Sequence, residues 1–299
     1  MKQLLFVYNP KAGRQRAKTM LSDVLTVFAQ EGYQITVRPT LGPGDATQVV
    51  ADTAAHYDRV VCCGGDGTLN ETVGGLLSLP QEERPVLGYI PAGTTNDFSR
   101  NINLPRSTQE LARVACGGVP RSIDVGDLGG RQFLYIAAFG LFTDVSYSTP
   151  QASKNLLGHL AYVLQGAGRL VNFPSYQVKV TTDQGLEVEG EFIYGMVSNT
   201  VSIGGMVNLP RDLVCLDDGQ FEALLIRTPK TAKDWQSILT ALTTQKLPDD
   251  GSVVGFTCSQ AHFTSPKPLA WTVDGEFGGD YTDLTISNRS RVLTIACGN

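Results

Sequence analysis

Hydrophobic and polar positions in the first 120 residues follow two alternating periods. Short apolar runs bounded by polar residues are typical of buried strands, and apolar residues three or four positions apart are typical of amphipathic helices. The pattern predicts strands at Leu4–Tyr8, Tyr33–Thr40, Arg59–Cys63 and Val86–Ile90, and helices at Arg16–Gln30, Asp45–Ala55 and Glu71–Leu79. Strands that alternate with helices indicate an α/β domain with a parallel sheet covered on both faces.

The pattern changes after Ser122 to short runs rich in β-branched and aromatic residues. Most connections between the runs are too short for crossover helices, so the strands should pair antiparallel. The predicted strands are Phe133–Phe139, Tyr176–Thr182, Glu187–Ser198, Phe221–Arg227, Val253–Thr264, Leu269–Val273 and Tyr281–Ile286, with helices near Lys154–Leu170 and Thr231–Gln245. We therefore expect an α/β domain at residues 1–122 and a β-rich, antiparallel β-sandwich-like domain at 123–289. The tail, 290–299, has one further apolar run that the sequence allows to return to the first domain.

Composition and charge narrow the function. Hydrophobic residues make up 42% of the 299 residues and charged residues 18%, which is typical of a globular enzyme. The net charge of -5 argues against a nucleic-acid partner, because phosphate backbones are bound by clustered Lys and Arg. Six cysteines without a CxxC pair, and only three histidines, argue against a zinc site or a disulfide framework. No apolar run is long enough to span a membrane. These features favour the reducing cytoplasm.

The most informative segment is Gly64–Glu71, with the sequence GGDGTLNE, at a predicted strand-to-helix junction. Glycines let a backbone approach a phosphate, and the amides that open a helix favour an anion. Asp66 is then placed to meet magnesium or the transferring phosphate. A tight turn with a capping Asp is the structural alternative. The loops richest in Gly, Asn and Thr follow the first, third and fourth strands, at the sheet edge where ligands bind in such folds.

This segment and Pro91–Arg100, with the sequence PAGTTNDFSR, together resemble the diacylglycerol kinase catalytic family, which includes soluble bacterial lipid kinases. The resemblance extends from Asn9–Gly13 to Asp274–Glu276. It implies a fold like that of NAD kinases, with an ATP-binding α/β domain, a β-rich domain for the lipid, and ATP in the cleft between them.

The resemblance also implies roles for individual residues. The implied nucleotide contacts are Asn9, Thr40, Gly64, Gly65, Asp66, Gly67, Thr68, Leu69, Asn70, Glu71, Thr94, Thr95 and Asn96. The implied catalytic residues are Asp66 and Glu276, with Glu276 as the general base. From the residues alone, Thr40 is equally a structural strand-end Thr, and Asp274–Glu276 a hairpin turn with exposed acids.

Leu216–Phe221 resembles the stretch that holds a structural Mg²⁺ in bacterial members of the family. The implied ligands are the Asp218 side chain and the backbone carbonyls of Cys215 and Gln220, and oxygen ligands suit Mg²⁺. A plain Asx turn is the alternative. Asp124 matches a family position near the nucleotide, although a hinge turn explains it nearly as well.

The implied reaction is transfer of the ATP γ-phosphoryl group to the hydroxyl of diacylglycerol or a related lipid, giving phosphatidic acid. Phosphatidylglycerol, monoacylglycerol and sphingoid bases remain alternative substrates. NAD kinase is less favoured, because Ser198–Thr200 lacks the expected Asn-Glu motif, and a non-catalytic regulator because both acids are present.

A membrane lipid substrate implies peripheral, transient contact with the inner membrane face. Basic residues that could face the membrane are Lys154, Arg169, Arg100 and Arg106. The apolar helix predicted between the first two has core packing as its alternative role. The sequence leaves a homodimer open.

Overall fold

The structure, a computed structural model, describes residues 1–141, 174–199, 202–203, 207–208, 215–244 and 246–298. The chain divides into two compact units, of which the first is Met1–Val125 with Ser290–Asn299 and the second is Gly126–Arg289. The sequence placed this division after residue 122 and left open where the tail belongs. The helix expected at Lys154–Leu170 lies outside the described residues.

A parallel sheet forms the centre of the first unit. Its strands are β1 (Lys2–Tyr8), β2 (Tyr33–Pro39), β3 (Arg59–Gly64) and β4 (Val86–Pro91), in the order β4-β3-β1-β2. The end of the long strand β15 (Glu276–Cys297) adds to β4 in parallel, with Ile295 opposite Leu87. Leu4 to Val7 of β1 are all buried, as expected of a strand covered on both faces.

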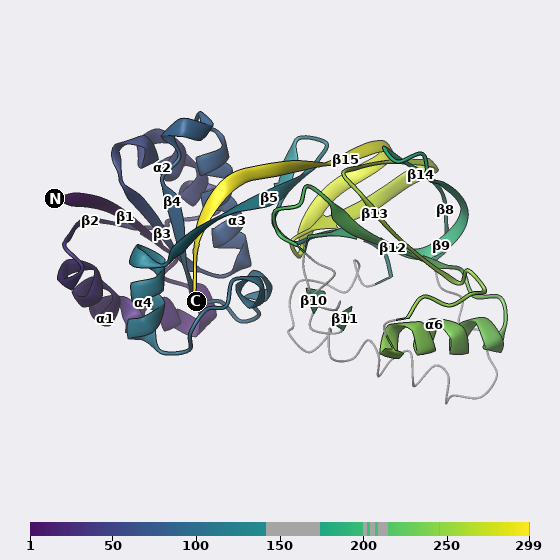
Figure 1. The fold of residues 1–299 in the computed structure, drawn as a ribbon, viewed down its shortest axis with the longest axis horizontal. Coiled ribbons are helices and arrows are strands. Elements are labelled where there is room, and N and C mark those ends of the chain that lie inside the picture. Colours follow the sequence, from purple (N-terminus) through teal and green to yellow (C-terminus); the bar gives the residue numbers. More distant parts are fainter. Residues whose placement is uncertain (142–173, 200–201, 204–206, 209–214, 245, 299) are drawn as a thin grey trace. The chain divides into compact units, whose positions relative to one another are not determined.

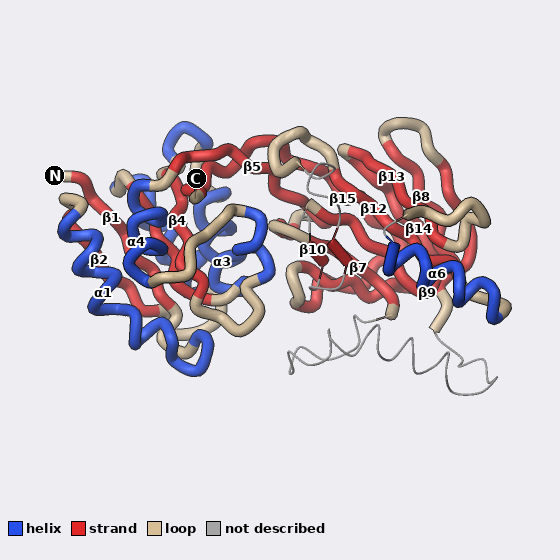
Figure 2. Tube along the Cα trace, turned by 60° about the horizontal axis from the view of Figure 1, so that its bottom comes forward, coloured by secondary structure: helices blue, strands red, loops and turns tan. Residues whose placement is uncertain are grey.

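Helices cover both faces of this sheet. They are α1 (Arg16–Gln30), α2 (Asp45–Thr53), α3 (Asp66–Leu77) and α4 (Thr108–Gly117), with the short 3₁₀ turns η1 (Ala12–Gln15), η2 (Ala54–His56), η3 (Gln81–Glu83) and η4 (Asp97–Asn101). Helix α1 packs beside α4, and α2 packs beside α3 (Figures 1 and 2). Helix α3 begins at Asp66 rather than at the predicted Glu71, because Gly65 ends the strand and an acid is favoured in a first helical turn.

The second unit is built from antiparallel strands. They are the end of β5 (Val119–Leu128), β6 (Arg131–Phe133), β7 (Ile136–Gly140), β8 (Tyr176–Thr182), β9 (Glu187–Ser198), β10 (Ser202–Ile203), β11 (Val207–Asn208), β12 (Phe221–Arg227), β13 (Val253–Cys258), β14 (Gln260–Val273) and the start of β15, with helix α6 (Ala232–Thr244). The order is β13-β12-β9-β7-β14-β15, and β8 pairs with both β9 and β14. Strands β5 and β15 each run from one unit into the other (Figure 1).

Aromatic rings fill the core of this unit. The rings of Phe139 and Phe263 each lie with their centroids 5.0 Å from that of Trp271, in edge-to-face contacts. Phe133 and Phe221 stack with centroids 5.5 Å apart. Such pairs favour a fixed arrangement of neighbouring strands, since offset and edge-to-face geometries are the favourable ones.

Two predicted strands are broken by carboxylates that accept hydrogen bonds from the backbone. Val253–Thr264 ends and restarts at Ser259, where Asp183 accepts from the amides of Ser259 and Gln260 at 3.2 and 3.1 Å. Phe133–Phe139 is interrupted at Leu134 and Tyr135, whose amides donate to Asp274. Both carboxylates come from distant parts of the sequence, so the pattern of each run could not indicate its break.

Candidate functional site

Three loops meet at the carboxyl ends of β1, β3 and β4 in the first unit. The carbonyl oxygen of Gly64 accepts from the amides of Ala92 and Gly93 at 2.8 and 3.2 Å. The Asn9 Nδ2 group donates to Thr68 Oγ1 at 3.2 Å. The loops that the sequence singled out separately therefore form one hydrogen-bonded cluster at the edge of the sheet where ligands bind in this class of fold.

Glycine is required where two of these loops touch. A Cβ atom on Gly93 would lie 2.5 Å from the Cα atom of Gly65 and 2.7 Å from Asn96 Oδ1. A Cβ atom on Gly13, in the first loop, would collide with the carbonyl oxygen of Ala92. Only bare backbone fits at these contacts, which keeps main-chain groups at the surface of the cluster.

Asp66 is fixed at the start of α3 by the neighbouring loop. Its carboxylate accepts from the amides of Asp97 and Phe98 at 3.1 and 3.4 Å and from Thr95 Oγ1 at 3.3 Å. Burial raises the pKa of the Asp66 carboxyl, and the donating amides oppose part of that rise. The carboxylate is thus oriented but poorly hydrated, and a cation or a cationic ligand would favour its charged form.

A second carboxyl, Asp97, lies beside Asp66 and was not among the predicted site residues. Burial raises the pKa of Asp97, and the charge of Asp66 raises it further. The signal was present in the sequence, because Asp97 belongs to the same PAGTTNDFSR motif. Two partly buried acids side by side favour a cation or a shared proton.

The other predicted residues of this loop differ in role. Asn96 adopts a left-handed conformation with a φ angle of 50°, and its side chain accepts from the Gly93 amide at 2.8 Å and donates to the Gly93 carbonyl at 2.9 Å. It therefore shapes the loop. Thr94 and Thr95 are exposed, which leaves their hydroxyl groups near the surface of the cluster.

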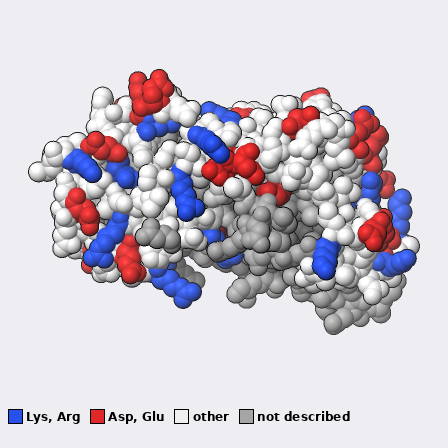
Figure 3. All heavy atoms as spheres, viewed as in Figure 1, with Lys and Arg blue, Asp and Glu red and all other residues white. Residues whose placement is uncertain are grey.

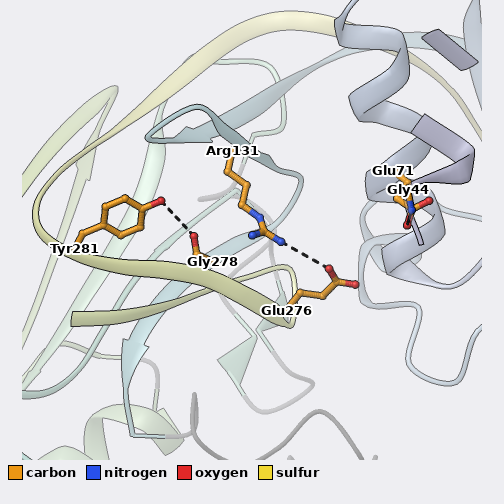
Figure 4. A network of polar contacts seen from close by, with 6 residues as sticks. All are labelled: Gly44, Glu71, Arg131, Glu276, Gly278 and Tyr281. Carbon is orange, nitrogen blue, oxygen red and sulfur yellow. Dashed lines mark hydrogen bonds and ion pairs between the residues drawn. The ribbon is translucent and has the colours of Figure 1, made fainter. Parts of the chain in front are cut away.

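Several predicted nucleotide contacts have their polar groups engaged elsewhere. Leu69 is buried in the core and its amide donates to the Gly65 carbonyl at 3.0 Å, within the first turn of α3. The Glu71 carboxylate accepts from the amides of Gly44 and Ala46 at 2.8 and 3.3 Å, at the start of α2 (Figure 4). Both residues thus serve the fold of the first unit.

The remaining positions of the motif lie around the cluster. The Thr40 amide donates to the Tyr8 carbonyl at 2.9 Å, so Thr40 continues the β2 edge beyond its last residue. Gly67 and Asn70 are half-buried in α3, and Thr68 is buried with its hydroxyl group bonded to Asn9.

Glu276 lies in the second unit, at the first position of β15. Its carboxylate pairs with the Arg131 guanidinium of β6 at 3.8 Å, and its side chain is 65% exposed (Figure 4). Arg131 was not predicted. Exposure leaves the Glu276 carboxylate accessible to a ligand.

The loop at Asp218 forms the Asx turn that the sequence left as an alternative. Asp218 Oδ1 accepts from the Gln220 amide at 2.9 Å, and the Gln220 carbonyl accepts from Asn288 Nδ2 at 3.2 Å. Cys215 is exposed, and its thiol donates to Asp217 at 3.2 Å. Every group of the implied metal site is thus present, although these contacts involve protein partners.

The surroundings of this turn nevertheless suit Mg²⁺. In the part of the chain that the structure describes, Glu222 Oε2 and Asn288 Oδ1 are buried without a hydrogen-bond partner. Burial raises the pKa of Glu222 to about 8, and the charge of Asp218 adds to the rise. Unpartnered oxygens close to a carboxylate fit a hard cation. No group of three or more His, Cys, Asp or Glu side chains gathers among the described residues, so such an ion would depend on carbonyl and amide oxygens.

Asp124 holds two strands of the first unit together. It is fully buried, and its Oδ1 atom accepts at 2.8 Å from the amide of Arg291, a residue with a φ angle of 53°. Asp124 thereby stabilises an unusual backbone conformation in β15, as the hinge-turn alternative predicts.

Comparisons with known proteins agree on one family. The model of the diacylglycerol kinase catalytic domain matches residues 3–128. A diacylglycerol kinase of Bacillus subtilis (strain 168) is 34% identical over 281 residues, which cover 93% of this chain and 91% of that protein. One of Staphylococcus aureus (strain MRSA252) is 33% identical over 280 residues, covering 93% and 87%.

Solved structures give the same answer. A diacylglycerol kinase of Bacillus anthracis str. Sterne has a TM-score of 0.79 at 28% identity, covering 99% of this chain and 97% of that one. The expected fold class, an α/β domain followed by a β-rich domain as in NAD kinases and diacylglycerol kinases, is confirmed. The chain belongs to the diacylglycerol kinase family, and this membership identifies it as a kinase. Its described residues contain no helix that is long and apolar enough to cross a membrane.

Proposed function

We propose that this protein transfers the γ-phosphoryl group of ATP to the hydroxyl of diacylglycerol, giving phosphatidic acid and ADP. The observation that carries the proposal is the cluster of loops around Gly64, Asp66 and Gly93, where glycine contacts bring bare backbone and one oriented carboxylate together. Backbone groups of this kind suit phosphates, and its relatives from B. subtilis and S. aureus are diacylglycerol kinases.

In the proposed reaction the first unit binds the nucleotide. Main-chain groups of the Gly64–Gly67 segment lie against the phosphates, and Asn9 and Asn96 keep the surrounding loops in place through their bonds to Thr68 and Gly93. Asp66 and Asp97 face the Mg²⁺ that accompanies ATP. Catalysis of phosphoryl transfer depends chiefly on such positioning and on stabilisation of charge.

Glu276 is the proposed general base. The lipid hydroxyl oxygen forms a bond to the γ-phosphorus, the bond to the ADP oxygen breaks, and the hydroxyl proton passes to the Glu276 carboxylate. A carboxylate that accepts a proton during transfer typically contributes a factor of about 10² to 10⁴ to the rate. Its exposure in the structure is consistent with this role.

A second Mg²⁺ would be held by Asp218 with the carbonyls of Cys215 and Gln220. Such an ion supplies fixed positive charge and rigidity rather than a reacting group. The unpartnered oxygens of Glu222 and Asn288 support its presence.

The proposal also requires contact with a membrane, where diacylglycerol resides, and we propose that this contact is peripheral. Lys and Arg side chains are interspersed with Asp and Glu on the face drawn in Figure 3, so the attraction to anionic lipids should be weak there. Arg100 and Arg106 are exposed, whereas Lys154 and Arg169 lie outside the described residues.

The direct test is transfer of label from [γ-³²P]ATP to lipids in mixed micelles. The panel contains diacylglycerol, monoacylglycerol, phosphatidylglycerol and sphingosine, with NAD as a soluble acceptor, and the Asp66→Ala variant is the blank. We expect label chiefly in phosphatidic acid. Preferential labelling of another acceptor would reassign the substrate, and the absence of label in all of them would refute the proposal.

A further inference from the structure

The turn that carries Glu276 is anchored by its neighbour Asp274. Strands β14 and β15 are joined through Asp274 and Gly275, which have φ angles of 48° and 85°. Positive φ angles at both positions define a type I′ hairpin turn, for which Asp-Gly is a preferred pair. Glu276 follows at once as the first residue of β15, so its position depends on the conformation of this turn.

The Asp274 carboxylate does not face solvent. Asp274 is buried, with 7% of its surface exposed, and its two oxygens accept from the amides of Leu134, Tyr135 and Ile136 at 2.7, 3.0 and 3.1 Å. The Asp274 amide in turn donates to the Ile136 carbonyl at 2.9 Å. One residue thus fastens the hairpin turn to the corner between β6 and β7.

This corner is held from its other side as well. The carbonyl oxygen of Tyr135 accepts from Ser198 Oγ at 3.0 Å and from the Asn199 amide at 3.0 Å, and both of these residues are buried. The corner is therefore a fixed support, with Asp274 on its amide side and β9 on its carbonyl side. Arg131, the ion-pair partner of Glu276, lies on β6, the strand that leads into the corner.

We infer that Asp274 is the positioning residue of this kinase, which sets the place of Glu276 by anchoring the turn to the β6–β7 corner; the inference rests on the proposed role of Glu276 as base. Stability alone does not require this arrangement, because an Asp-Gly pair can form the turn without a second support. A base must lie within hydrogen-bond reach of the proton that it accepts, and a misplacement of about 1 Å can cost about 100-fold in rate.

The test is Asp274→Asn, which keeps the size of the side chain but presents an amide group to three backbone donors. We expect kcat to fall about 10- to 100-fold while the KM for ATP stays unchanged, because the nucleotide loops belong to the first unit. Asp280→Asn is the matched control. It removes an exposed acid from the same strand and should keep kcat within about twofold, as expected of a surface substitution.

A double variant separates positioning from a general loss of structure. If Asp274 acts through Glu276, Asp274→Asn combined with Glu276→Gln should be no slower than Glu276→Gln alone, since residues that act as a unit are not additive. Losses that multiply in the double variant, or a wild-type kcat in Asp274→Asn, would overturn the inference. If Glu276→Gln itself keeps full activity, the proposed base is wrong, and that single variant identifies which proposal failed.

Substitutions at Gly275 cover the case in which Asp274→Asn does not fold. A Cβ atom there would have its nearest neighbour, Tyr135 Oη, at 3.8 Å, so space is available and the backbone conformation alone is tested. Asn tolerates a positive φ angle and Val does not. We expect Gly275→Asn to keep kcat, and Gly275→Val to lower it without effect in the Glu276→Gln background. Equal kcat values for Gly275→Val and wild type would contradict the inference.

Discussion

Each unit of the molecule contains one acid that backbone amides hold in place, but the two acids differ in what they can do. In the first unit the held acid, Asp66, lies at the surface of the loop cluster and is itself placed for chemistry. In the second unit the held acid, Asp274, is buried, and the exposed acid is Glu276 two residues later. The same device therefore orients a reacting group directly in one unit and through the chain in the other.

The difference has an electrostatic consequence. A carboxylate held in a partly buried place loses hydration, which raises the pKa of Asp66. The exposed carboxylate of Glu276 keeps its access to water and ligands. The first suits a group that meets a cation, and the second suits a group that exchanges a proton with a substrate.

The largest effect is expected from Asp66→Asn. Loss of an oriented charge at a phosphate site typically costs about 10² to 10³ in kcat. The fold should not suffer, because the pKa of Asp66 is raised in the folded state, and wild-type stability therefore falls as pH rises from the ordinary Asp pKa through the raised one. Asp66→Asn should thus equal or exceed the wild type in urea midpoint at pH 7. A lower midpoint would show that the Asp66 charge stabilises the fold.

Gly93→Ala should have the next largest effect. The added methyl group would press on Gly65 and Asn96, so the loops must separate, and we expect a stability loss of about 1–3 kcal/mol with a raised KM for ATP. Gly42→Ala is the matched control, since a Cβ atom there meets nothing within 4 Å. Both are measured by denaturant unfolding and by rates at varied ATP. Equal behaviour of the two variants would contradict the close approach of the loops.

Removal of Mg²⁺ should have an intermediate effect on the second unit. If a structural ion binds at Asp218, a chelator should lower the thermal midpoint by several degrees, because a ligand at 100 times its Kd stabilises by about 2.7 kcal/mol. In Asp218→Ala the chelator should change nothing, since the implied side-chain ligand is gone. Identical wild-type midpoints with Mg²⁺ and with chelator would argue against the ion.

The smallest effect is expected from Arg131→Ala. The pair with Glu276 is long and about half of each side chain is exposed, so its loss should change stability by at most about 1 kcal/mol. Lys179→Ala, which removes the exposed partner of Glu187 at 2.9 Å, is the control. Activity assays on both variants would show whether Arg131 matters beyond stability. A large loss of kcat in Arg131→Ala alone would give it a direct part in the reaction.

The sequence predicted the elements of the first unit well, because period and turn residues are local signals. Strands β8, β9 and β12 coincide with their predicted runs, and the loops of the cluster were placed correctly after their strands. Leu69 and Glu71 show the limit of a motif. Both belong to GGDGTLNE, yet helix α3 buries the first side chain and directs the second to α2.

Roles that depend on distant contacts could not be predicted. Asp274 finds its partners at Leu134–Ile136, 140 to 138 positions earlier in the chain, and no local pattern connects the two segments. Asp97 is a different case, because it stood in a motif already singled out. Its importance follows from its proximity to Asp66, which only the folded loops establish.

The division of roles between the two acids is tested most directly by measuring ATP affinity and single-turnover phosphoryl transfer in Asp66→Asn and Glu276→Gln side by side. The account predicts that Glu276→Gln binds ATP within about twofold of wild type but transfers the phosphoryl group about 10² to 10⁴ times more slowly, as expected when a general base is removed. Asp66→Asn should weaken both binding of Mg²⁺–ATP and transfer. A Glu276→Gln variant that transfers at the wild-type rate, or that loses ATP affinity as strongly as Asp66→Asn, would contradict the account.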